Sequence, residues 1–170
     1  GVFALVAVAR AVGARRAAAV AAVLAAALAL AGCGGLSPGA DDGRLRVVAT
    51  TTQLGDFARQ AGGGRVDVTQ LLRANTDPHD YEPRPHDVLA VARADLVLRS
   101  GGEVDAWLGD VVEQAGGHAT VVDAGAGRPY ARAEPHWWHD PRNAAYAVGR
   151  IRAALARADP ADAGAFARAA

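Results

Sequence analysis

Cysteine is nearly absent from this sequence: Cys33 is the only one among 170 residues. A single cysteine excludes an intramolecular disulfide and any zinc site built from cysteines alone. Lysine and methionine are missing, and 18 arginines balance 18 acidic residues, so the formal net charge is zero. Because nucleic-acid-binding proteins normally show a clustered basic excess, we expect no nucleic-acid partner. A bound metal ion would have to use histidine and carboxylate ligands.

The N-terminal segment has the pattern of a secretory signal peptide. Three arginines fall within the first 16 residues, and an uncharged run rich in alanine, leucine and valine follows at 17–31. That run has 15 residues. A membrane-spanning helix needs about 20 residues to cross a hydrocarbon core ~30 Å thick. We therefore interpret residues 1–32 as a removable signal peptide.

Cys33 ends the sequence Leu30-Ala31-Gly32-Cys33. These four residues resemble the lipobox of bacterial lipoproteins, which implies cleavage before Cys33 and acylation of that residue. Acyl chains contribute about 0.8 kcal/mol per buried CH₂, and more than one chain gives stable anchoring to a lipid bilayer. The alternative is a free cysteine buried on a hydrophobic helix. We expect an extracytoplasmic protein, anchored to the outer face of the cell membrane or held in the periplasm.

The segment after the signal peptide is rich in glycine, serine, proline and aspartate. This composition is typical of a flexible tether, which we place at residues 33–43. Without residues 1–32 the chain keeps 15 arginines and 18 acidic residues, a net charge of −3. A mildly acidic surface of this kind suits a cationic ligand.

The rest of the chain alternates strand and helix patterns. This order predicts an α/β fold with a parallel four-stranded sheet flanked by helices, occupying residues 44–158. Apolar and β-branched runs predict strands at 45–51, 66–72, 95–99 and 120–123. Helical spacing predicts helices at 54–61, 85–94, 104–114 and 142–158, and a further helix after Pro160. Ligands of such sheets collect beyond the carboxyl ends of the strands, where the two long loops lie.

The first long loop places His79 between Pro78 and Pro83, which restrict the backbone. A rigid loop presents an imidazole with little loss of entropy on binding. Tyr81 and Glu82 lie close enough in sequence to pack or hydrogen-bond around it, and such a partner fixes the tautomer of a ligating histidine. Taken alone, an isolated loop histidine is more often an ordinary surface residue.

The second long loop contains His136, which follows a proline and precedes two tryptophans. The bulky aromatic side chains of Trp137 and Trp138 would shield a site from water, although such pairs more often serve packing. His139 is a weaker ligand candidate, because no HExxH pattern is present and the neighbouring Asp-Pro pair at 140–141 is typical of a helix start. Neutral imidazoles suit Zn²⁺, Mn²⁺ and similar divalent ions.

Four other polar residues are better explained without a ligand. His86 follows a proline at a helix start, and His118 stands beside two glycines, so we expect both at the surface. Glu103 and Asp105 could form a carboxylate pair. A solvated helix start explains the two acids better, because negative charge is favourable at a helix N-terminus.

Together the two histidine loops carry a family resemblance. The sequences HDYEP at 79–83 and PHWWHDPRN at 135–143, in that order after a lipobox, resemble the cluster A-I metal-binding lipoproteins of zinc and manganese ABC importers. Residues 47–51 and 101–108 look like that family too. The resemblance covers essentially all of residues 44–170.

The resemblance implies a protein of two α/β lobes joined by a long helix, with a divalent metal held between the lobes. His79 and His136 match the first and second ligands, both from the N-terminal lobe. The remaining ligands would come from a C-terminal lobe absent from this chain, and residues 159–170 would begin the linking helix. Nothing is carried over onto His139. These implications require the His79 and His136 imidazoles to meet at one edge of the sheet.

The function implied by the resemblance is capture of Zn²⁺ or Mn²⁺ and delivery to a cognate ABC permease, without catalysis. We expect a monomer anchored to the lipid bilayer through Cys33. Relatives selective for zinc often have a long histidine-rich loop before the second ligand, but residues 125–134 contain no histidine. The choice between the metals therefore stays open. One alternative is a secreted zinc-dependent hydrolase with Glu82 as general base. Another is a surface adhesin of the same fold.

Overall fold

A four-stranded parallel sheet forms the core of the part of the chain that the computed structural model describes, residues 43–130 and 134–169. The spatial order of the strands is β2-β1-β3-β4, and each neighbouring pair is parallel. The strands are β1 (Leu45–Ala49), β2 (Val66–Gln70), β3 (Leu96–Arg99) and β4 (Thr120–Asp123). The predicted fold class is therefore confirmed.

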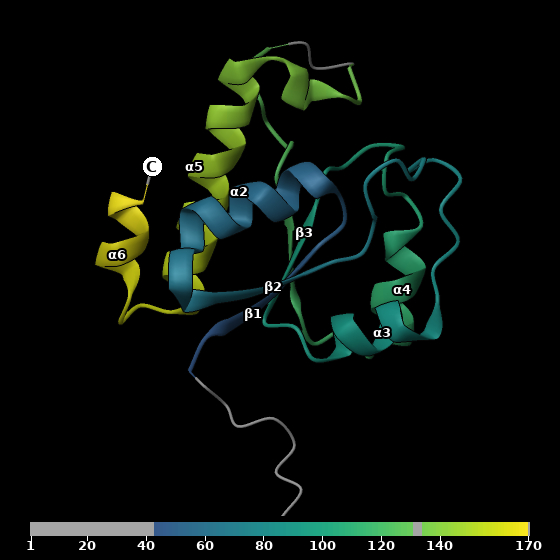
Figure 1. The fold of residues 1–170 in the computed structure, drawn as a ribbon, viewed down its shortest axis with the longest axis horizontal. Helices are drawn as coiled ribbons and strands as arrows, with labels where there is room; N and C mark the ends of the chain where they lie inside the picture. Colours follow the sequence, from purple (N-terminus) through teal and green to yellow (C-terminus); the bar gives the residue numbers. More distant parts are fainter. Residues whose placement is uncertain (1–42, 131–133, 170) are drawn as a thin grey trace, which may run out of the picture. The chain divides into compact units, whose positions relative to one another are not determined.

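Helices cover both faces of this sheet, as Figure 1 shows, with α2, α5 and α6 on one side and α3 and α4 on the other. These helices are α2 (Thr52–Gly62), α3 (Pro85–Ala92), α4 (Leu108–Gln114), α5 (Pro141–Ala158) and α6 (Ala163–Arg168). Successive strand residues face opposite layers, so Val47 packs under α2 and α5 while Val48 packs under α3 and α4. Both faces are buried, which explains why the central strands are apolar without alternation.

Local signals set the start of the two helices that pack on β1 and β3. The Thr51 hydroxyl accepts a hydrogen bond from the Leu54 amide at 3.3 Å, and Asp140 accepts one from the Arg142 amide at 2.9 Å. Both are N-cap contacts that satisfy amides left open by the first turn. The cap at Thr51 also ends β1 at Ala49, two residues before the predicted end of that strand.

The helix predicted at 104–114 begins only at Leu108. Asp105, which was expected in its first turn, is not solvated. Asp105 is 2% exposed and accepts hydrogen bonds from Thr50 Oγ1 (2.6 Å) and from the amides of Ser100 (2.6 Å) and Gly101 (2.9 Å). The expectation of a solvated helix start was therefore wrong for Asp105. Its carboxylate instead holds a turn in which Gly101 adopts φ +87°, a conformation that favours glycine.

The helix expected after Pro160 begins at Ala163 and packs against α5. Phe166 is 1% exposed within the same core as β1 and α2, and its carbonyl accepts a 2.9 Å hydrogen bond from Arg152 Nε. Continuation of α6 into a linking helix stays a prediction. Within the described ranges, no helix is long and apolar enough to cross a membrane. The expected signal peptide, Cys33 and nearly all of the tether lie outside the described residues.

Candidate metal centre

The loops that follow the two outer strands of the sheet bring His79 and His136 together. The loop carrying His79 follows β2, and the loop carrying His136 follows β4, the two outer strands. Parallel strands have their carboxyl ends at one edge, so both loops lie on the same side of the sheet. The centroids of the His79 and His136 rings are 5.6 Å apart, with the rings inclined at 70°. The proximity required by the sequence interpretation is present in the structure.

Glu134 contacts the His136 ring on one side. Its Oε1 accepts a hydrogen bond from the His136 amide at 2.9 Å and lies 3.0 Å from His136 Nδ1. These two contacts, the backbone one first, hold the pKa of Glu134 below its ordinary value. With the proton on Nδ1, the Nε2 lone pair is left for a metal ion, which is the usual arrangement of a ligating histidine and a supporting carboxylate.

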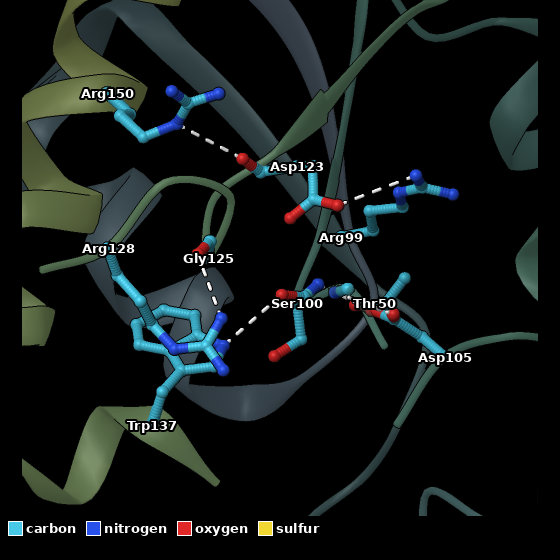
Figure 2. A network of polar contacts seen from close by, with 10 residues as sticks. Thr50, Arg99, Ser100, Asp105, Asp123, Gly125, Arg128, Trp137 and Arg150 are labelled. Carbon is cyan, nitrogen blue, oxygen red and sulfur yellow. Dashed lines mark hydrogen bonds and ion pairs between the residues drawn. The ribbon is translucent and has the colours of Figure 1, made fainter. Parts of the chain in front are cut away.

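The backbone beside His136 is anchored in the core by Trp137, for which the sequence offered a packing role, and by Asn143, to which it assigned none. Trp137 is 2% exposed, and its indole N–H donates to the Ser100 carbonyl at 3.2 Å (Figure 2). Asn143, fully buried on α5, donates from Nδ2 to the Trp137 carbonyl at 3.3 Å. The loop that presents His136 is thus held against the end of β3 and the start of α5.

Arg128 joins the two ends of the same loop by hydrogen bonds. Its guanidinium donates to the Gly125 carbonyl at 3.0 Å and to the Glu134 carbonyl at 2.8 Å. Figure 2 shows the Arg128 side chain reaching toward Gly125 next to Trp137. An added Cβ at Gly125 would lie 2.6 Å from both the Ser100 carbonyl oxygen and Trp137 Nε1. Only glycine therefore permits this close approach of the chain to the indole.

Neither of the two residues expected to support His79 forms a hydrogen bond with its ring in the described part of the chain. Tyr81 donates its hydroxyl to Asp87 Oδ2 at 2.7 Å, and burial together with this bond raises the pKa of Tyr81 to about 12. The phenol therefore stays protonated at neutral pH and acts as a donor. Glu82 is exposed, and within the described ranges it forms no hydrogen bond with His79. A direct role for either residue at the His79 imidazole stays a prediction without a supporting contact.

The other histidines lie at varying distances from this pair. His139 is exposed, with its ring centroid 6.4 Å from that of His136. His86 is exposed on α3 and directs Nε2 to Asp87 Oδ1 at 2.8 Å, and His118 is exposed in the turn before β4. Among the described residues, no three histidine, cysteine or acidic side chains are grouped closely enough to hold a metal ion. The His79–His136 pair therefore offers a partial coordination sphere.

A hollow of about 200 Å³ opens beside the pair. Its lining combines the first turn of α2 with both histidine loops and includes Thr51, Leu72, Pro78, His136 and Trp138. The His136 and Trp138 rings meet edge to face at 5.4 Å, so the indole forms one wall next to the imidazole.

Comparison with known proteins places this arrangement in a family. The family described as "Zinc-uptake complex component A periplasmic" (ZnuA) matches residues 47–170. The chain belongs to the ZnuA family. Its sheet order and its two histidine loops can therefore be compared with those of metal-binding proteins in this family.

Individual ZnuA-type proteins named for different metals match this chain. The manganese-binding lipoprotein MntA of Bacillus subtilis is 36% identical over 159 residues, covering 86% of this chain and 51% of that relative. The manganese ABC transporter substrate-binding lipoprotein PsaA of Streptococcus anginosus is 33% identical over 93 residues, covering 52% and 30% of the two chains. The periplasmic zinc-binding protein TroA of Treponema pallidum superposes with a TM-score of 0.67 at 27% identity, covering 74% and 48%. The chain thus spans about half the length, or less, of the relatives it matches.

Proposed function

We propose that this ZnuA-family protein captures a divalent transition metal, Zn²⁺ or Mn²⁺, outside the cytoplasm and delivers it to an ABC permease. The observation that carries the proposal is the approach of the His79 and His136 rings to 5.6 Å at the carboxyl edge of the sheet. Two imidazoles from rigid loops are a suitable half of a site for a borderline metal ion.

The chemistry of His136 supports this assignment. The Glu134 carboxylate lies on the Nδ1 side of the ring, so Nε2 is the nitrogen left to bind metal. The described residues hold no group of three histidine, cysteine or acidic ligands, so the proposal requires further ligands from chain outside them. Relatives named as manganese and zinc binders keep both metals as candidates. Neither the hydrolase nor the adhesin alternative gains a supporting contact from the structure.

Titration of the full-length protein with Zn²⁺ and Mn²⁺ against a competing chelator tests the proposal. We expect His79→Ala and His136→Ala each to weaken binding by more than about tenfold, because even supporting residues of a metal site typically cost that much when removed. His118→Ala is the matched control, because it removes an exposed histidine in a distant turn. Wild-type affinity in the His79→Ala, His136→Ala double variant would contradict the assignment.

The anchoring part of the proposal rests on Cys33. Acylation at this residue would hold the protein at the outer face of the membrane, within reach of a permease. Incorporation of a labelled fatty acid should occur in the wild type and disappear in Cys33→Ser. Unchanged labelling of Cys33→Ser would exclude this anchor without affecting the metal assignment.

A further inference from the structure

The loop that carries His79 is gripped on both sides of that residue by the α3–α4 layer. On the N-terminal side, the Trp107 indole N–H donates to the Pro78 carbonyl at 3.2 Å. On the C-terminal side, the Tyr81 ring packs on the Trp107 ring with centroids 4.8 Å apart, and the Tyr81 hydroxyl donates to Asp87. We call Tyr81, Asp87 and Trp107 the aromatic clamp.

Asp87 is the fixed point of this clamp. Its side chain is completely buried, on the third residue of α3. Oδ2 accepts both the Tyr81 hydroxyl and the Arg84 amide at 2.7 Å, whereas Oδ1, which accepts no hydrogen bond from the described residues, lies 2.8 Å from His86 Nε2. Burying a carboxylate is costly unless it accepts hydrogen bonds, so the two bonds at Oδ2 are needed to keep Asp87 in this position. One carboxylate therefore joins the start of α3 to the residue two positions after His79.

The His79 side chain has few contacts that would fix its own position. It is exposed, and its amide is held locally by Asp77 Oδ1 at 2.9 Å. In the described part of the chain its imidazole contacts the His136 ring but forms no hydrogen bond. The direction of this side chain consequently depends on how the backbone at Pro78 and Tyr81 is held.

The two histidines are attached to opposite layers of the domain. The His136 loop is anchored through Trp137, which belongs to the core shared with α2 and α5. The aromatic clamp belongs to the other side, where Trp107 packs with α3 and α4. Because the layers are separated by the sheet, the spacing of the two rings depends on both anchors independently.

We propose that the aromatic clamp positions His79 for metal binding, a role that rests on the function proposed above. The clamp fixes the imidazole before the metal arrives, so less conformational freedom is lost when it binds. Tyr81 thus supports the site, but through Asp87 and Trp107 rather than by a hydrogen bond to the imidazole. The three members act as positioning residues and not as ligands.

Tyr81→Phe is the most selective probe, since it removes one hydroxyl and keeps the ring against Trp107. We expect this variant of the full-length protein to bind Zn²⁺ about tenfold more weakly, the lower end of the usual effect of supporting residues. Asp95→Asn is the matched control, because it weakens a hydrogen bond to the Arg46 amide at the amino ends of the strands, away from both histidine loops. The control should keep wild-type affinity.

A double-mutant cycle separates positioning from a loss of stability. If the clamp acts through His79, Tyr81→Phe should have no further effect on affinity in a His79→Ala background. It should keep its full effect in a His136→Ala background. Equal effects in both backgrounds, or wild-type affinity of Tyr81→Phe, would overturn the proposal. If His79→Ala itself left affinity unchanged, the proposed function would fail instead.

Substitutions of Asp87 and Trp107 test the other contacts of the aromatic clamp. Asp87→Asn keeps an oxygen acceptor for Tyr81 and Arg84, so it should retain affinity within about threefold, whereas Asp87→Leu should lose about tenfold or more. Trp107→Phe removes the donor to Pro78 and should weaken binding in the same direction as Tyr81→Phe. Wild-type affinity of both Asp87→Leu and Trp107→Phe, with folding verified by circular dichroism, would also overturn the proposal.

Discussion

Replacing Asp105 with alanine should strongly destabilise the domain. This carboxylate accepts three hydrogen bonds from Thr50 Oγ1 and the amides of Ser100 and Gly101, all of which are buried. Each buried donor left without a partner costs about 1–3 kcal/mol. Water entering the space of the lost carboxylate would recover part of that cost, so we expect the free energy of unfolding to fall by roughly 3–5 kcal/mol.

The asparagine variant gives an intermediate case. An amide oxygen in the position of Oδ2 would still accept from Thr50 and Ser100. Its NH₂ group would then face the Gly101 amide, so one bond becomes a contact between two donors. We therefore expect Asp105→Asn to lose about 1–3 kcal/mol, less than Asp105→Ala.

Urea unfolding of the purified variants, followed by circular dichroism and tryptophan fluorescence, measures these differences. Glu103→Ala is the matched control, since Glu103 is an exposed acid in the same turn and should change stability by less than about 0.5 kcal/mol. A loss below about 1 kcal/mol for Asp105→Ala, or a larger loss for the asparagine variant, would refute the hydrogen-bond argument.

Two other substitutions test the His136 loop and the last helix. Glu134→Ala should weaken Zn²⁺ binding by about tenfold in a chelator competition, because His136 loses the acceptor on its Nδ1 side; equal affinities would show that this contact is dispensable. Phe166→Ala should lower the free energy of unfolding by about 3–5 kcal/mol, because it empties a 1% exposed core position. Exposed Arg168→Ala is its control, and equal urea midpoints for the two variants would contradict the packing of α6 on α5.

The Tyr81 side chain shows where sequence reasoning reached its limit at the site. Proximity in sequence to His79 identified the residue as a supporting group, but its partner is Asp87, six positions further along the chain. In the sequence, Asp87 falls in the first turn of the helix predicted at 85–94, and no role was assigned to it. Nothing in its neighbours shows that one of its oxygens is shared between that turn and the His79 loop.

The same limit applies to Asp105 and Trp107. Asp105 was expected in solvent, yet its hydroxyl partner Thr50 is 55 residues away, and the carbonyl bound by Trp107 is 29 residues away. Periodicity and capping patterns describe neighbours within a few positions, so they carry no information about such pairs. A polar residue beside the apolar Val104 and Leu108 was the available hint that this turn is buried.

The local order of the elements followed from the sequence alone, because β-branched runs, helical spacing and proline or threonine at the helix starts act over short distances. The flanking prolines and the aromatic neighbours likewise identified His79 and His136 as candidates. Only the tertiary structure decided that loops from the two outer strands converge, and that the α3–α4 layer holds one ring while the α5 layer holds the other. That outcome depends on packing across a sheet, and such packing joins residues whose separation along the chain leaves no local signature.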